Sequence, residues 1–176
     1  AFKYQGGLDL TGYEDGTENP EGDDAVNAGI VQNLGKGLDG SSFVAVQKWI
    51  HGLTRFESFP LQEQDNMIGR FKSDNEEMTN APDSAHIRRT AQEDFEPQAF
   101  ILRRSMPWAN DRQEGLVFVA FGKSTDAFDA LLKRMVGLDD GIQDALFRFT
   151  KPVSGSYYWC PPMHNEKLDL SLLELE

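Results

Sequence analysis

The sequence contains a single cysteine, Cys160, among 176 residues. One thiol cannot form an intrachain disulfide, and a lone cysteine cannot build a cysteine-ligated zinc or iron–sulfur centre. Low cysteine usage is typical of proteins from a reducing compartment, so we expect a cytoplasmic location.

Long apolar runs are also missing. No stretch of about 18 consecutive apolar residues occurs, as a transmembrane helix would require. The first four residues, AFKY, lack the form of a secretory leader. We therefore predict neither a membrane span nor a secretion signal.

Basic residues are scarce relative to acidic ones. The chain has 17 Lys and Arg against 29 Asp and Glu, a formal net charge of −12. Such a charge disfavours nucleic acid and anionic membranes as main partners. A small organic or cationic substrate is easier to accommodate.

What remains is the composition of a folded protein. Hydrophobic residues make up 39% and charged residues 26% of the chain, which is typical of a soluble globular domain rather than a disordered one. The length allows one domain with a substantial core.

Hydrophobic patterns predict strands and helices in mixed order. Short apolar runs predict strands over residues 43–50, 98–105 and 116–121, the last two as antiparallel neighbours. Helical spacing over residues 53–69, interrupted by Pro60, predicts a helix in two pieces.

Two further helices are predicted towards the C-terminus. Their apolar residues recur at i, i+3, i+4 and i+7, first from Phe128 to Met135 and then from Ile142 to Phe149. Residues 22–40 and 71–97 are expected to be loops, and residues 163–176 a polar acidic tail. Strands and helices without strict βαβ alternation indicate the α+β class.

The segment GYEDGTENP, residues 12–20, is the most informative motif. Two glycines flank Asp15 closely, and a proline closes the turn that follows. Glycine permits positive φ and close backbone approach, so this segment, the Asp15 loop, is predicted to be a rigid loop that presents one carboxylate. An ordinary surface turn has the same local pattern.

Three downstream segments extend the pattern: AHIRR from residue 85, FILRRSMPW from residue 100 and GLVFVAF from residue 115. Together with the Asp15 loop they resemble the dye-decolorizing peroxidases, a haem enzyme family marked by a Gly-x-x-Asp-Gly loop. The resemblance covers nearly the whole chain. It implies a ferredoxin-like antiparallel sheet with helices packed on one face, of the dimeric α+β barrel type.

The resemblance also implies a domain assignment. Family members have two similar α+β halves, and residues 1–176 correspond to the C-terminal haem-binding half, with the N-terminal half absent from this sequence. The implied cofactor is haem b, iron protoporphyrin IX. The implied activity is reduction of hydrogen peroxide and oxidation of small organic donors such as dyes and phenols, by a homo-oligomer.

For the proximal side of the haem, the resemblance makes His86 the axial iron ligand. The other two histidines, His51 and His164, are expected to be solvated. A ligating imidazole usually donates its second ring N–H to a carboxylate. Asp140 and Asp144 share one face of the last predicted helix, and we expect Asp144, with Asp140 as the alternative, to be the partner of His86.

For the distal side, Asp15 is the family's acid–base group and Arg103 its permanent cation. Strand alternation directs Arg103 and Ser105 to one face and Arg104 to the other. Ser105 stands where some relatives have Asn, and it could hydrogen-bond peroxide or a distal water. Arg103 is expected to contact the haem as well as peroxide.

Remaining haem contacts are predicted from the same resemblance. Arg70 is the expected propionate-binding residue, with Arg88 and Lys72 as alternatives. Leu116 and Phe118 alternate with Val117 and are expected to wall the distal pocket, although core packing explains them equally well. Two other readings stay open: a haem carrier or iron-releasing protein, and an interaction module without a cofactor.

Overall fold

The strand β1 (Ser42–His51) is central to the antiparallel sheet, because it pairs with β4 (Glu114–Gly122) on one side and β5 (Thr150–Cys160) on the other. In this computed structural model, which describes residues 7–174, the sheet has five strands. Its order is β2-β4-β1-β5, and β3 (Met106–Ala109) continues beside β4 after β2 (Leu102–Arg103).

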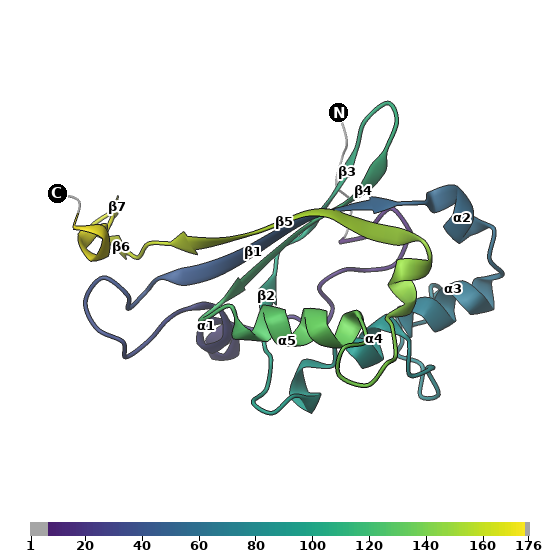
Figure 1. The fold of residues 1–176 in the computed structure, drawn as a ribbon, viewed down its shortest axis with the longest axis horizontal. Coiled ribbons are helices and arrows are strands. Elements are labelled where there is room, and N and C mark those ends of the chain that lie inside the picture. The colour runs from purple at the N-terminus through teal and green to yellow at the C-terminus, as the bar shows by residue number, and fades with distance from the viewer. Residues whose placement is uncertain (1–6, 175–176) are drawn as a thin grey trace.

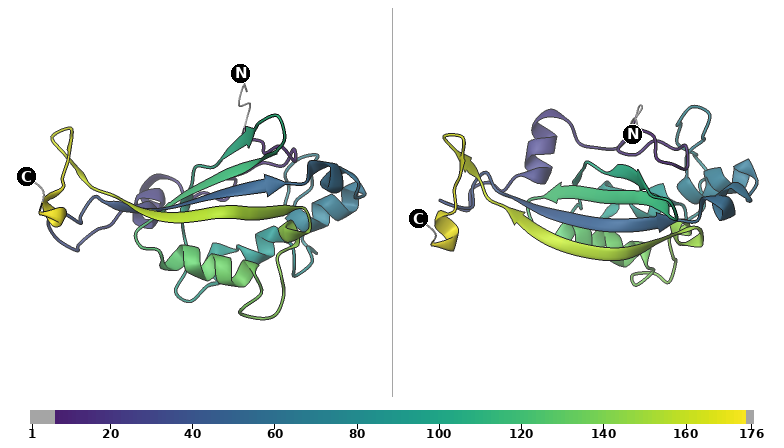
Figure 2. Two further views of the ribbon diagram at one scale, coloured as in Figure 1. Left: turned by 45° about the horizontal axis from the view of Figure 1, so that its top comes forward. Right: turned by 90° about the horizontal axis from the view of Figure 1, so that it is seen from above.

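Helices cover one face of this sheet, as Figure 1 shows. The longest, α5 (Asp126–Met135), runs beneath the strands, and the short α4 (His86–Arg89) lies near its C-terminal end. Seen from above, β5, β1 and β4 lie in front of α5 (Figure 2). The sheet and α5 therefore form two layers.

Smaller elements surround these layers. They are α1 (Gly22–Gly29), α2 (Leu53–Glu57), α3 (Leu61–Ile68), the 3-10 turns η1 (Gln92–Asp94), η2 (Ala145–Arg148) and η3 (Ser171–Leu173), and the short strands β6 (Met163–His164) and β7 (Lys167–Leu168). No helix within residues 7–174 is long and apolar enough to cross a membrane.

Most predicted elements are present. The α+β class and the antiparallel sheet are confirmed, and Pro60 separates α2 from α3 as expected. The expected loops at 22–40 and 71–97 were each wrong in part, since the first contains α1 and the second contains α4 and η1. The predicted tail contains β6, β7 and η3, while residues 1–6 and 175–176, including the segment judged not to be a leader, lie outside the described residues.

Two predicted elements need correction. The strand expected over 98–105 is only two residues long, because the Ile101 amide, just before β2, donates to the Gln92 side chain instead of to a neighbouring strand. The helix expected from Ile142 to Phe149 is the 3-10 turn η2 preceded by a loop. Its apolar spacing comes from separate contacts with the core rather than from a continuous helical stripe.

Two apolar clusters hold the layers together. The first joins the sheet to α5 and consists of Ala45, Phe95, Ala99, Ile101, Ala120, Phe128 and Leu131. The second lies under α2, α3 and η2 and consists of Tyr13, Phe56, Met67, Ala145 and Phe149. Tyr13 belongs to the Asp15 loop, so that loop is packed into the core.

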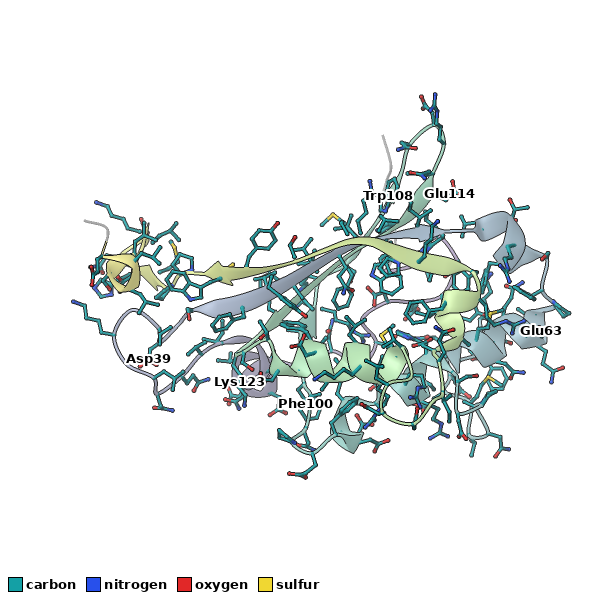
Figure 3. The ribbon with its side chains drawn as sticks, in the orientation of Figure 1. Asp39, Glu63, Phe100, Trp108, Glu114 and Lys123 are labelled. Atoms are coloured by element: carbon teal, nitrogen blue, oxygen red, sulfur yellow. The ribbon has the colours of Figure 1, made fainter. Side chains whose placement is uncertain are left out.

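A glycine permits a close strand contact at the base of the β3–β4 hairpin, the projecting hairpin in which Figure 3 labels Trp108 and Glu114. The indole Nε1 of Trp108 donates to the Trp49 carbonyl at 3.0 Å, crossing from β3 past β4 to β1. A Cβ added to Gly115, between these strands, would lie 2.0 Å from the same oxygen. The register at this end of the sheet therefore requires glycine.

We expect Gly115→Ala to lower the free energy of unfolding by about 2 to 3 kcal/mol, because the new methyl group would displace backbone rather than a flexible side chain. Urea unfolding monitored by circular dichroism measures this change.

Gly155→Ala is the matched control on β5. Its Cβ would meet only the Gln47 side chain, at 3.7 Å, so we expect a change below about 1 kcal/mol. An equal decrease in the free energy of unfolding in Gly115→Ala and Gly155→Ala would contradict the assigned register.

Candidate functional site

A large, mainly apolar cavity lies between the sheet and α5. Its empty volume is about 860 Å³, including open solvent at its mouth. The lining side chains come from the sheet, α4, α5, η1, η2 and the Asp15 loop. They are Asp15, Ala45, Gln47, Trp49, His51, His86, Thr90, Gln92, Ile101, Arg103, Leu116, Phe118, Phe128, Leu131, Leu132, Met135, Leu146, Thr150 and Tyr157.

The sheet register explains which strand residues line the cavity. Alternate residues of β1 from Ala45 to His51 face it, because successive side chains of a strand point to opposite faces. Directly paired residues share a face, so Phe118 lies beside Gln47 and Leu116 beside Trp49. Leu116 and Phe118 thus take the wall positions expected of them.

The opposite wall is formed by α5. Its apolar residues Phe128, Leu131, Leu132 and Met135, spaced as the sequence predicted, all line the cavity. At the edge of the cavity, the half-exposed Tyr157 donates its hydroxyl hydrogen to Asp129 at 2.7 Å. Burial, followed by this bond, raises the pKa of Tyr157 to about 12.

His86 and Asp144 are brought together at this cavity. The Nδ1 atom of His86 lies 2.8 Å from Asp144 Oδ2, and Asp144 is 1% exposed. Asp144 also caps η2 by accepting the Leu146 amide at 2.8 Å. A carboxylate only accepts, so Nδ1 carries the hydrogen, and in the neutral imidazole the lone pair is on Nε2. Among the hydrogen bonds of residues 7–174, none uses that Nε2 atom.

Asp140 has a different partner. Both of its oxygens accept from Arg89 at 2.7 Å, and Arg89 also donates to the Arg134 carbonyl at the end of α5. The bonds from Arg89 and from the Ile142 amide lower the pKa of Asp140. This pair joins α4 to α5, whereas Asp144 lies in the loop that faces His86. The expected common helix face of Asp140 and Asp144 was wrong because no α-helix forms there.

Asp15 and Arg103 both line the cavity, whereas Arg104 is exposed. The Arg103 Nε and the Ser105 Oγ are buried and have no hydrogen-bond partner among residues 7–174. Buried polar atoms without partners are rare and point to a missing ligand or water. Ser105 itself is not among the lining residues.

Arg70 does not reach the cavity. Its guanidinium pairs with Glu18 of the Asp15 loop, lies 3.5 Å from Glu77, and donates to the Asn75 carbonyl at 2.8 Å. The predicted propionate contact is therefore not supported by its position. Neither alternative lines the cavity: Arg88 donates to the Thr79 carbonyl, and the Lys72 ammonium lies over the Tyr13 ring.

His51, expected to be solvated, is buried and lines the cavity. Its Nδ1 contacts Thr150 Oγ1 at 2.6 Å and its Nε2 contacts Asp9 Oδ1 at 3.3 Å. Asp9 precedes the Asp15 loop and accepts two further hydrogen bonds from Thr11. The alternation of β1 contained this signal, since His51 has the same parity as Trp49.

A second buried anchor lies in the Asp15 loop itself. The Tyr13 hydroxyl donates to Asp65 of α3 at 2.6 Å. Burial and this bond raise the pKa of Tyr13. The polypeptide that presents Asp15 is therefore fixed to β1 through Asp9 and to α3 through Tyr13.

Comparisons with known proteins agree with this geometry. The family model of the Dyp-type peroxidase C-terminal domain matches residues 7–165. The chain belongs to the dye-decolorizing peroxidase family. A dye-decolorizing peroxidase of Rhodococcus erythropolis is 35% identical over 166 residues, which cover 91% of this chain and 49% of that protein.

Solved structures of dye-decolorizing peroxidases have the same fold. The dye-decolorizing protein from V. cholerae superimposes with a TM-score of 0.83 at 34% identity, covering 91% of this chain and 54% of that one. A Rhodococcus jostii DypB variant in complex with haem gives 0.84 at 27% identity, covering 92% and 54%. The chain thus spans about half the length of the relatives that it matches.

Asp9 is expected to make stability depend on pH. Burial by itself would raise the pKa of Asp9, but the hydrogen bond and charge of His51, together with the Thr11 bonds, lower it below 3.8. A carboxyl group with a lowered pKa stabilises the fold above its unfolded value, and this contribution is lost as the pH falls through the folded value.

Asp9→Asn should therefore lower the free energy of unfolding by about 1 to 2 kcal/mol near neutral pH, with the difference from wild type vanishing in acid. Urea unfolding from about pH 6 to pH 3 measures it. Asp24→Asn, on the exposed side of α1, should follow the wild-type curve; a constant offset for Asp9→Asn at all pH values would refute the linkage.

Proposed function

We propose that residues 1–176 are the C-terminal haem-binding domain of a dye-decolorizing peroxidase that reduces hydrogen peroxide and oxidises organic donors. The observation that carries this proposal is the His86–Asp144 pair, in which one ring nitrogen is held by a buried carboxylate while the imidazole lines a large apolar cavity. The family membership supports it.

The residues present fit a haem group. A flat apolar macrocycle suits the space between the β1 and β4 side chains and the apolar stripe of α5. His86 Nε2 would hold the iron, with Asp144 making the ligand more basic by accepting the Nδ1 hydrogen. Arg103 lines the cavity, and its unpartnered Nε is a donor available to ligands on the haem.

Haem bound here would supply the iron at which the O–O bond of peroxide breaks and would store the oxidising equivalents passed to organic donors. Asp15, as a carboxylate, would take the proton from one peroxide oxygen and return it to the other, which leaves as water. Arg103 would stabilise the negative charge that develops on the departing oxygen. Ser105 would orient peroxide or a distal water.

Haem propionates would need cations. Among the cavity-lining side chains of residues 7–174, Arg103 is the only arginine or lysine. We therefore propose Arg103 for this contact as well, ahead of Arg70. His51 also lines the cavity, but both of its ring nitrogens are engaged.

The proposed partners are hydrogen peroxide, small organic donors and a second copy of the chain. The exposed side chains of Val153 and Tyr158 along β5 support self-association. The proposed cytoplasmic location is supported only by the low cysteine content.

We expect His86→Ala to abolish haem binding, because no second imidazole in the cavity has a free nitrogen. Asp144→Asn should still bind haem but raise the ferric/ferrous potential by about 60 to 120 mV, equivalent to a ten- to hundredfold change in relative affinity for the two oxidation states. Spectroelectrochemistry measures this potential. Asp139→Asn, an exposed neighbour, is the control, and an unchanged potential in Asp144→Asn would refute the proximal pairing.

For peroxide chemistry, we expect Asp15→Ala to slow the reaction of the haem-loaded chain with hydrogen peroxide by about 10² to 10⁴ fold. Arg103→Leu should slow it by about 10² to 10³ fold. Haem binding should persist in both, since neither residue is the ligand. Stopped-flow absorbance gives these rates.

Asp23→Ala and Arg112→Leu remove exposed charges of the same kind and should react at the wild-type rate. If the wild-type chain binds haem but does not react with peroxide, the peroxidase assignment fails and a haem carrier replaces it. If no haem absorbance develops, the chain is an interaction module.

A further inference from the structure

We propose that Asn19 is a positioning residue that holds Arg103 and Asp15 in one rigid unit; this inference rests on the proposed function. Asn19 is the eighth residue of the Asp15 loop and is not one of the residues that line the cavity. It acts through the backbone of Arg103.

The Asn19 amide pairs with both backbone groups of Arg103. The Arg103 N–H donates to Asn19 Oδ1 at 2.8 Å, and Asn19 Nδ2 donates to the Arg103 carbonyl at 3.0 Å. A primary amide has one acceptor and two donors in a plane, so it can replace the peptide group of a neighbouring strand. The side chain therefore takes the place of one residue of a strand beside β2.

This replacement is needed because β2 is short and lies at the edge of the sheet. In an antiparallel pair, alternate residues direct their N–H and C=O groups away from the partner strand. Arg103 is such a residue, whereas the next backbone amide, of Arg104, donates inward to the Val119 carbonyl at 2.7 Å. The Arg103 carbonyl also accepts from Arg104 Nη1 at 2.8 Å, while its N–H donates to Asn19. Asn19 thus satisfies groups that the sheet leaves open at the cavity residue.

The chain between Asp15 and Asn19 is shaped for this contact. The backbone N–H of Asn19 closes a turn by donating to the Gly16 carbonyl at 3.1 Å. Gly16 has a φ of +85°, and a Cβ there would lie 2.9 Å from Asn19 Nδ2. Gly16 therefore provides both the backbone conformation and the space that let Asn19 reach back to Arg103, one residue after Asp15.

Asn19 matters for the position of Arg103 because the Arg103 side chain has few partners of its own. Its Nε is buried without a partner among residues 7–174, and the same described region gives its side chain no ion pair. The hydrogen bonds that place Arg103 within this region are therefore those of its backbone, and Asn19 makes two of them. They set the point and the angle at which the side chain leaves β2. Loss of the Asn19 amide would let Arg103 and Asp15 move independently.

The test compares Asn19→Ala and Asn19→Asp with wild type. The first readout is hydrogen exchange at the Arg103 amide in the haem-free chain. The second is the fluoride affinity of the ferric haem-loaded chain, since a haem-bound anion depends on a well-placed distal donor but not on turnover. The third is the rate of reaction with hydrogen peroxide. Asn110→Ala is the matched control, because Asn110 accepts two backbone amides at 2.9 Å in the β3–β4 hairpin.

We expect Asn19→Ala to bind haem, to exchange the Arg103 amide at least about tenfold faster, and to lose about tenfold in fluoride affinity and in peroxide rate, because both hydrogen bonds to the Arg103 backbone are lost. Asn19→Asp keeps the shape and the acceptor but loses the donor. It should be impaired near neutral pH and approach wild type in acid, where a protonated carboxyl group again donates to the Arg103 carbonyl. If Asn19→Ala folds poorly, the Asn19→Asp variant alone tests whether the Asn19 side chain positions Arg103.

Two results would overturn the proposal. An Arg103 amide that exchanges at the wild-type rate in both variants would show that the Asn19 contact does not hold β2. Faster exchange with unchanged fluoride affinity would restrict Asn19 to a structural role.

A wild-type chain that binds haem and fluoride but does not react with peroxide would refute the proposed function alone. The exchange rate and the fluoride affinity would still test the role of Asn19.

Discussion

The antiparallel pairing of β1 with β4 and β5 is the constraint on which the site depends. It places every second residue of β1 on the cavity face and sets their neighbours across the sheet. A slip of one residue would turn Gln47, Trp49 and His51 away from the cavity. The Trp108 indole and the missing side chain of Gly115 fix this register where the strands end.

Around that sheet, the polar residues of the cavity are held from two sides. His86 comes from α4, which Arg89 joins to Asp140 and to the end of α5. Asp15 comes from a loop anchored through Tyr13 on α3 and through Asp9 on β1. These anchors are buried or partly buried hydrogen bonds. Removing one partner would leave the other desolvated without a hydrogen bond, which destabilises the fold. His86 and Asp15 are therefore held at the edge of the cavity by contacts outside it.

Much of this arrangement could be predicted from the sequence. The 3.6-residue period from Phe128 to Met135 predicted the helix whose apolar stripe faces the cavity, and strand alternation separated Arg103 from Arg104. The same period from Ile142 to Phe149 was misleading, because Asp144 turns inward to His86 and caps a short 3-10 turn instead of continuing a helix. Local spacing does not contain that long-range contact.

The misplaced residues share one cause. Arg70 was expected at the cavity but pairs with Glu18, more than 50 positions away in sequence, and His51 was expected in solvent although Asp9 buries its outer nitrogen. In both cases an acidic residue near the N-terminus decides the position, and neither partner can be recognised from the residues beside it. The net charge of the chain gave no sign of which carboxylates turn inward.

The two histidines that line the cavity differ in how many of their ring nitrogens have a hydrogen-bond partner, although each is paired with a carboxylate. His51 and His86 each have an aspartate partner, so a survey of imidazole–carboxylate pairs would score them alike. His51 uses both ring nitrogens within the protein, whereas His86 uses one. Within residues 7–174, His86 Nε2 is therefore the one imidazole nitrogen of the cavity without a hydrogen-bond partner, so an incoming metal centre can bind a histidine only on the α4 side.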